Sequence, residues 1–156
     1  MRLQLVCVGK QTSNWVTDGF NQYWQRLVSP LQHICIEINT VKRSKTKAID
    51  GLKEQEAKAI LKTISQDSHC VMLDESGTLW DTSQLAKQMQ QWLELAKTTT
   101  LVIGGPDGLA PSCLTRANQV WSLSPLTLPH PLVRILVAEQ LYRAQSILAN
   151  HPYHRA

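Results

Sequence analysis

Two patterns of apolar residues alternate along this chain. Short, nearly continuous apolar runs predict strands, at residues 3–8, 34–38, 69–73, 100–103 and 119–123. Between them, apolar positions at helical spacing predict helices, at residues 13–27, 49–64, 81–95, 111–117 and 131–148. This alternation predicts an α/β fold with a mostly parallel sheet and helices on both faces. The chain shows no repeat or linker, so we expect a single domain over residues 1–156.

The starts of two helices carry clear signals. Ser13 precedes the first predicted helix and Asp81-Thr-Ser the third, and both are residue types that commonly cap helix N-termini. We expect the first helix to contribute its large apolar side chains to the core. These are Trp15, Phe20, Trp24 and Leu27.

The last predicted helix is apolar on nearly every side, which is typical of a helix buried on more than one face. Pro131 suits its first turn, where a proline removes no needed N–H group. Glu139 and Arg143 lie four residues apart and mark one polar stripe. Arg134 lies in the middle of an apolar face, where a charge needs a partner. Either it forms a buried ion pair or extends off the helix end, or it projects into a pocket made by the preceding loops.

Three predicted strands end abruptly in loops of small residues. One loop is Gly104-Gly-Pro-Asp-Gly108, another is rich in Ser, Pro and Thr (residues 122–130), and the third is Asp74-Glu-Ser-Gly77. Because the carboxyl ends of neighbouring parallel strands form ligand crevices, we expect a pocket here for a flat, mostly uncharged group. The glycine-rich loop matches neither phosphate-binding pattern and has no basic side chain beside it in the sequence. A neutral or cationic ligand is therefore expected, with a simple tight turn as the alternative.

Positive charge is unevenly distributed along the chain, whose net charge is +4. Lys42, Arg43, Lys45 and Lys47 crowd one short segment, and after the glycine-rich loop Glu139 is the single acid. A basic surface attracts polyanions without specifying them. We favour a nucleic-acid partner over a merely solvated basic loop.

Composition argues against several classes of protein. No apolar run approaches the ~20 residues that span a membrane, and the N-terminus lacks the pattern of a signal peptide. The cysteines, Cys7, Cys35, Cys70 and Cys113, show no metal-ligand spacing. We therefore expect a cytoplasmic protein with free thiols, no membrane partner and no metal.

The C-terminal tail combines three side chains suited to RNA. The Tyr153 ring can stack on a base, the Arg155 guanidinium can bind a phosphate or a base carbonyl, and the His154 imidazole can move a proton. Terminal residues are commonly frayed and inert, which is the alternative.

Three motifs together resemble one known family. Ile103-Gly-Gly-Pro-Asp-Gly108, Ser122-Leu-Ser-Pro-Leu-Thr-Leu-Pro-His-Pro131 and Asn150-His-Pro-Tyr-His-Arg155 are similar to motifs of the RlmH family of SPOUT-class RNA methyltransferases. The resemblance covers essentially the whole chain. It implies methylation of N3 of a pseudouridine in large-subunit (23S) ribosomal RNA, with S-adenosyl-L-methionine as methyl donor. It also implies a homodimer and a SPOUT-type fold with a trefoil knot near the C-terminus.

The resemblance also implies which residues form the site. The implied cofactor contacts are Leu73, Gly104, Leu123, Ser124, Pro125, Leu126, Thr127 and Leu128. Pro125 departs from the expected pattern, because a proline offers a ligand only its carbonyl or its ring.

Methylation of an imide nitrogen requires loss of its proton and benefits from a cation near the base carbonyls. Arg134 and His154 are the expected catalytic residues, and His130, Tyr153 and Arg155 the expected substrate-binding residues. Arg155 is also a candidate for the cation, and His130 or water a candidate for the base.

Two other functions remain open at this stage. One is a SPOUT methyltransferase for another RNA base, and the other is a non-catalytic ribosome-binding factor. For the pseudouridine methyltransferase the expected partner is ribosomal RNA or the assembled ribosome. We expect a homodimer in every case, because Leu132, Leu136 and Ile147 of the last helix would be poorly covered in a monomer.

Overall fold

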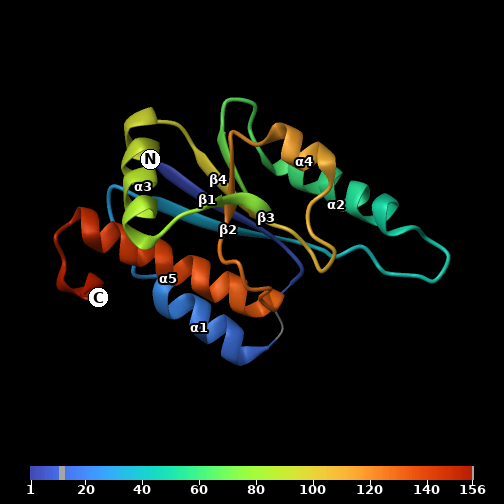
Figure 1. Cartoon of the computed structure of the whole chain (residues 1–156), viewed down its shortest axis with the longest axis horizontal. Coiled ribbons are helices and arrows are strands. Elements are labelled where there is room, and N and C mark those ends of the chain that lie inside the picture. Colours follow the sequence, from blue (N-terminus) through green and yellow to red (C-terminus); the bar gives the residue numbers. More distant parts are fainter. Residues whose placement is uncertain (11–12, 156) are drawn as a thin grey trace.

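The computed structural model describes residues 1–10 and 13–155. Within them the chain forms a five-stranded sheet in the order β2-β1-β4-β3-β5, and every pair of neighbouring strands is parallel (Figure 1). The strands are β1 (Arg2–Val8), β2 (Gln32–Ile38), β3 (His69–Leu79), β4 (Thr99–Ile103) and β5 (Gln119–Ser122). The predicted α/β class and the parallel sheet are confirmed.

Helices cover both faces of this sheet. They are α1 (Asn14–Trp24), α2 (Ile49–Thr63), α3 (Thr82–Leu95), α4 (Pro111–Arg116) and α5 (His130–Leu148), followed by a short 3-10 turn, η1 (Pro152–His154). The helices α1, α3 and α5 pack on one face, where α5 touches both others, and α2 and α4 pack on the opposite face (Figure 1). Among the described residues, no helix is both long and apolar enough to cross a membrane.

Local sequence explains where α3 begins. Asp81 accepts a hydrogen bond from the Gln84 backbone N–H at 2.7 Å, and the Gln84 side chain accepts one from the Asp81 N–H at 2.8 Å. This reciprocal pair satisfies two N–H groups that a helix end leaves open. The predicted cap at Asp81 is therefore confirmed.

The apolar face of α1 differs from the prediction at one position. Phe20, Trp24 and Leu27 are buried as expected, but Trp15 is 59% exposed. The buried stripe of α1 runs through Val16, Phe20 and Trp24. Trp15 lies one residue before Val16, so its side chain is rotated about 100° around the helix axis from that buried position and points to solvent.

The third strand continues beyond its predicted end at Leu73. Leu73 and Thr78 are both paired with Trp121 of β5, so residues 74–77 form a bulge before the strand resumes. At Gly77 a Cβ would lie 2.6 Å from the backbone C and O atoms of Val120. The bulge therefore depends on a glycine, because no side chain fits between these two backbones.

Candidate functional site

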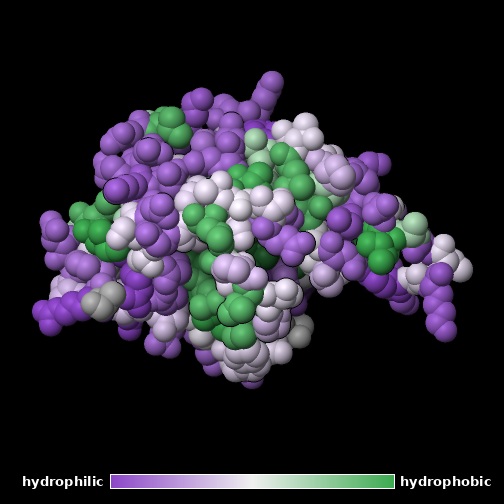
Figure 2. Space-filling model, in the orientation of Figure 1, coloured by the Kyte–Doolittle hydropathy of each residue, from purple (hydrophilic) through white to green (hydrophobic). Residues whose placement is uncertain are grey.

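The bulge of β3 and the carboxyl ends of β4 and β5 border one cavity of about 670 Å³. Its walls come from the loop after Leu73, from residues 103–109 after β4, and from residues 122–130, which connect β5 to α5. The connecting segment starts at the β5 edge of the sheet and ends at His130, which contacts Val8 at the end of β1. It therefore crosses the ends of β3 and β4. In Figure 2, which has the orientation of Figure 1, the surface is hollowed near its centre, and hydrophobic residues form part of the border of this hollow.

The cavity brings together most of the expected cofactor residues. Those that line it are Leu73, Gly104, Leu123, Ser124, Leu126, Thr127 and Leu128. Pro125 is not among the lining residues, although both its neighbours are. The three predicted loop segments do line one cavity, but only two of them follow strand ends, because β3 continues beyond Asp74-Glu-Ser-Gly77 to Leu79. The contact of each residue with a cofactor stays a prediction.

Two glycines shape the loop after β4 for different reasons. Gly108 has a φ of 82°, and its N–H donates to the Gly105 carbonyl at 3.0 Å, which closes a tight turn. At Gly104 a Cβ would lie 3.0 Å from the Gly108 carbonyl carbon and from the Leu109 side chain. The left-handed backbone angle in this loop is therefore found at Gly108, and Gly104 is needed for close packing of the turn.

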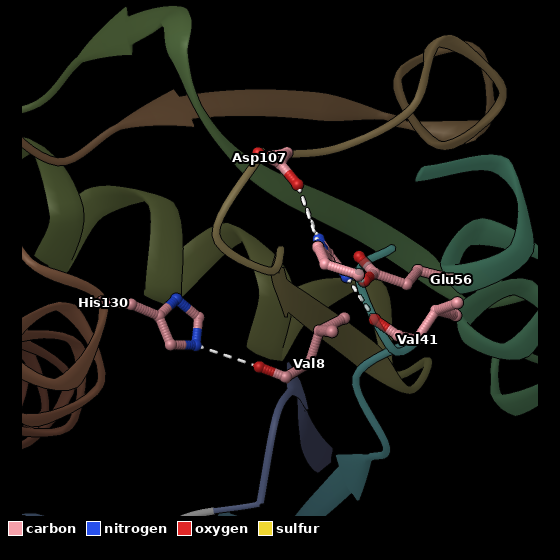
Figure 3. A network of polar contacts seen from close by, with 6 residues as sticks. Val8, Val41, Glu56, Asp107 and His130 are labelled. Carbon is pink, nitrogen blue, oxygen red and sulfur yellow. Dashed lines mark hydrogen bonds and ion pairs between the residues drawn. The ribbon is translucent and has the colours of Figure 1, made fainter. Parts of the chain in front are cut away.

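A cluster of charged side chains adjoins the glycine-rich loop. Arg43 donates from Nε and Nη2 to Asp107 Oδ2, at 3.0 and 2.8 Å, and from Nη1 to Glu56 and to the Val41 carbonyl (Figure 3). Lys53 of α2 lines the cavity as well. No basic side chain is close to this loop in the sequence, but the fold brings Arg43 to Asp107 from a segment 64 residues away.

One residue of this cluster, Glu56, could have been identified from the sequence. Glu56 is 2% exposed and lies at helical spacing between the buried residues Leu52 and Ile60 of α2. A carboxylate in an apolar stripe needs a cationic partner, just as Arg134 in its apolar face needs an anionic one. Nothing local marks Arg43 within its basic run, or Asp107 within its loop, as belonging to this cluster.

His130 lines the cavity and is held in one orientation. Its Nε2 lies 3.0 Å from the Val8 carbonyl (Figure 3). A carbonyl can only accept, so Nε2 carries the proton, and in the neutral ring Nδ1 keeps its lone pair. Burial lowers the pKa of His130, and nearby Arg134 lowers it further, against the opposing effects of the Val8 hydrogen bond and Glu56. His130 is thus a predominantly neutral imidazole with one nitrogen able to accept a proton.

Arg134 forms the buried ion pair that was one of the two alternatives. It is 4% exposed, and it donates from Nη1 to Glu37 Oε2 at 2.7 Å and from Nη2 to the Gly9 carbonyl at 2.8 Å. Arg134 is not among the residues that line the cavity. The structure therefore shows no projection of Arg134 into the pocket, and its catalytic role stays a prediction.

The tail docks on α5. The Tyr153 hydroxyl donates to Glu139 Oε1 at 3.0 Å, its ring centre lies 4.6 Å from that of Tyr142, and the Arg143 guanidinium lies 4.9 Å from the ring centre. Burial and the Glu139 carboxylate raise the pKa of Tyr153 to about 12. The tail is therefore ordered by specific contacts as far as His154.

The other two tail residues differ in exposure. His154 borders a second cavity of about 440 Å³, together with Arg143 and Ile147 of α5, and Arg155 is exposed. No tail residue that the structure describes lines the larger cavity. Within one chain the strand-end cavity therefore lies at the first turn of α5, at His130 and Val133, whereas the tail packs on the second half of the helix, from Glu139 onward.

Metal ligands are not gathered anywhere in the described part of the chain. No group of three or more His, Cys, Asp or Glu side chains there is placed to hold a metal ion. All four cysteines are free thiols.

Known proteins resemble this chain over its whole length. A family model described as "Predicted SPOUT methyltransferase" matches residues 1–154. The ribosomal RNA large subunit methyltransferase H of Hahella chejuensis (strain KCTC 2396) is 48% identical over 155 residues, which cover 99% of each chain.

Solved structures are more distant. The SpoU methyltransferase AviRb from Streptomyces viridochromogenes, in complex with the cofactor AdoMet, gives a TM-score of 0.47 at 11% identity, over 91% of this chain and 57% of AviRb. A structure described as "Structural insights into the 2-OH methylation of C/U34 on tRNA" gives 0.48 at 14% identity, over 96% of this chain and 98% of that one.

Proposed function

This chain belongs to the SPOUT methyltransferase family, as a relative of ribosomal RNA large subunit methyltransferase H, and from that premise we propose that it methylates large-subunit ribosomal RNA. The methyl donor is S-adenosyl-L-methionine. The target, following the motifs of the RlmH family, is N3 of a pseudouridine in 23S ribosomal RNA. A ribosomal substrate supports a cytoplasmic location, which is part of the same proposal.

The observation that carries this proposal is the cavity between the bulge of β3 and the ends of β4 and β5. Its volume, about 670 Å³, is within the usual range for small-molecule sites. Leu126 and Leu128 offer apolar surface to a flat ring, and Asp74 and Glu75 place carboxylates where a sulfonium or ammonium group is favoured. Lys53 of α2, which also lines the cavity, complements the donor's carboxylate. The residues present therefore fit the donor.

The bound donor supplies an activated methyl group on a sulfonium, so the protein has mainly to align a nitrogen lone pair with it and remove a proton. His130 lines the cavity with an unprotonated Nδ1, which suits it to accept the N3 proton or to hold a base carbonyl through a water. His154 is the alternative base. A cation from Arg134 or Arg155 would stabilise the developing anion.

The separation of tail and cavity in one chain supports a homodimer as the working unit. A second copy could bring its own tail residues, Tyr153, His154 and Arg155, to this cavity. Leu132 and Leu136 of α5 are each 38% exposed, so α5 has apolar surface left to bury.

The trefoil knot near the C-terminus belongs to the same proposal. Its support is the connection from β5 to α5, which crosses the ends of β3 and β4 instead of turning back beside its own strand. The segment that leaves β4 also starts at this edge, and connections that cross one another on one edge of a sheet are rare in proteins.

A methyl-transfer assay tests the proposed function. Tritiated donor would be incubated with ribosomes that lack the modification, with isolated large subunits and with free 23S RNA, and the labelled nucleoside identified. We expect label in 3-methylpseudouridine. Label in another nucleoside would show a different RNA target, and donor binding without transfer to any substrate would favour a ribosome-binding factor.

A further inference from the structure

The basic cluster lies on a projecting segment, residues 39–48, that joins β2 to α2 and is called the basic arm below. The arm extends from the right-hand end of the molecule in Figure 1. Lys42, Lys45 and Lys47 are exposed, and none of them joins an ion pair within residues 1–10 and 13–155. Three unpaired cations on an exposed loop suit the phosphates of a nucleic-acid backbone.

Arg43 stands out from its neighbours because it points back into the molecule. Its guanidinium holds three segments at once: the arm itself through the Val41 carbonyl, α2 through Glu56, and the glycine-rich loop through Asp107 (Figure 3). Two of its nitrogens share Asp107 Oδ2, at 3.0 and 2.8 Å. A lysine could not reproduce this set, because its single nitrogen lacks the planar fork of donors.

Glu56 links Arg43 to a second point of the glycine-rich loop, at Gly105. Its side chain is 2% exposed, and a Cβ built at Gly105 would lie 2.9 Å from Glu56 Oε2. The carboxylate is therefore packed directly against the backbone of the glycine-rich loop. A buried carboxylate without its cation is strongly unfavourable, so Arg43 cannot leave this position without disturbing the loop.

Binding of RNA should strengthen binding of the methyl donor, because Arg43 is already paired and the lysines, within the described part of the chain, are not. Arg43 is occupied by two carboxylates, whereas the lysines are available to phosphates. Phosphates bound by the lysines would hold the arm in place while Arg43 keeps its hold on Asp107. A loop ordered in this way has less conformational entropy left to lose when the methyl donor binds.

We propose that Arg43 is a positioning residue that couples the binding of RNA phosphates by the basic arm to cofactor binding by the Gly104–Leu109 loop. Each ligand then raises the affinity for the other by the same factor, as linkage requires. The proposal rests on the proposed function, because it takes RNA and a methyl donor as the two ligands. It adds a residue outside the cavity wall and a role for the arm.

Equilibrium dialysis with labelled S-adenosylhomocysteine, the demethylated product, measures the coupling without turnover. For the wild-type protein we expect saturating unmodified ribosomes to tighten this binding by at least about fivefold. Arg43→Ala should weaken product binding without ribosomes several-fold and abolish the tightening. Lys45→Ala with Lys47→Ala should leave product binding alone unchanged, weaken ribosome binding, and lower the slope of log affinity against log salt by about two.

A double-mutant cycle separates coupling from a general loss of structure. If Arg43 acts partly through Asp107, the two single substitutions share one interaction, so the effect of Arg43→Ala on product binding should be smaller in an Asp107→Ala background than in the wild-type protein, and what remains is the part that acts through Glu56; independent effects would add in full. Should Arg43→Ala fail to fold, Asp107→Asn keeps the Arg43–Glu56 pair and tests the same link. Thermal melting of each variant provides the control.

Different results would overturn different parts of the inference. Ribosome-dependent tightening that survives both Arg43→Ala and Asp107→Asn would remove Arg43 from the coupling. If ribosomes weakened product binding, the coupling would be negative and the proposal would be refuted. A wild-type protein that binds the product but shows no ribosome effect would refute the coupling alone, whereas one that binds no product would refute the proposed function as well.

Discussion

At the scale of single residues, Gly77 and Gly51 differ sharply in what a methyl group would meet. At Gly77 a Cβ would lie 2.6 Å from the backbone of Val120, and at exposed Gly51 in α2 it would meet nothing within 4 Å. We expect Gly77→Ala to lower the free energy of unfolding by about 1–3 kcal/mol, because backbone has to move. Gly51→Ala should raise it by about 0.5–1 kcal/mol. Urea denaturation of both variants checks this, and equal effects would contradict the close packing of the bulge.

Gly104 tests where the donor binds. A valine there would push against Gly108 and Leu109, because atoms of both residues lie 3.0 Å from where its Cβ would stand, and would distort the turn that lines the cavity. We expect Gly104→Val to abolish calorimetric binding of S-adenosylmethionine while circular dichroism stays native. Unchanged affinity would rule out this wall as part of the binding site.

His130 makes a prediction about pH. Burial lowers its pKa in the folded protein below the ordinary value of 6.5, so the unfolded chain binds more protons in this range. The free energy of unfolding should therefore fall as the pH drops from 6.5 through the folded pKa. In His130→Gln, whose amide can still donate to Val8, this part of the loss should vanish. Urea midpoints from pH 5 to 8 measure the difference, which should be flat above about pH 7; a flat difference throughout would mean that His130 is not held neutral.

At the scale of elements, strand and helix positions could be predicted far better than their irregularities. Every predicted strand is present, with starts within two residues, because short apolar runs are a local signal. The continuation of β3 to Leu79 was missed, since Asp74-Glu-Ser-Gly77 has the composition of a loop and its bulge is set by pairing with β5. Likewise, periodicity placed Arg134 on a buried face, but nothing local to it identified Glu37 or Gly9 as its partners.

The exposed face of α5 makes a prediction about assembly. Leu132 and Leu136 are four residues apart and each 38% exposed, so they form one apolar strip along the helix. We expect Leu136→Glu to convert a dimer into monomers, because dimerisation would bury the charge. Leu95→Glu, at a similarly exposed position (46%) on α3, is the matched control and should keep the wild-type mass. Light scattering decides, and a wild-type mass that is monomeric at all concentrations would refute the dimer.

At the scale of the whole molecule, the candidate site divides into the cavity proposed to bind the cofactor and a tail that does not line it in the same chain. The cavity could be predicted because loops that leave neighbouring parallel strands meet at one edge of the sheet. The ion pair between Arg43 and Asp107 beside this cavity could not be predicted, since the two residues are far apart in the sequence and no local pattern links them. The docking of Tyr153 on Glu139 was equally invisible, although the chemistry of each residue is notable in the sequence.

This division predicts what loss of the tail would do. Deletion of residues 151–156 should leave affinity for S-adenosylmethionine within a few-fold, because no described tail residue lines the cavity. Methyl transfer to ribosomes should nearly disappear, because the side chains suited to RNA are gone. Calorimetry and the tritium assay measure the two effects separately. Normal turnover by the truncated protein would show that the tail is dispensable.

The segment that crosses from β5 to α5 also has a consequence for synthesis. A chain that has emerged only as far as residue 122 contains the five described strands but lacks one wall of the cavity. Ligands stabilise a protein only in the state that binds them. A methyl donor that binds in this cavity would therefore protect the whole chain from proteolysis but not a nascent or prematurely ended one.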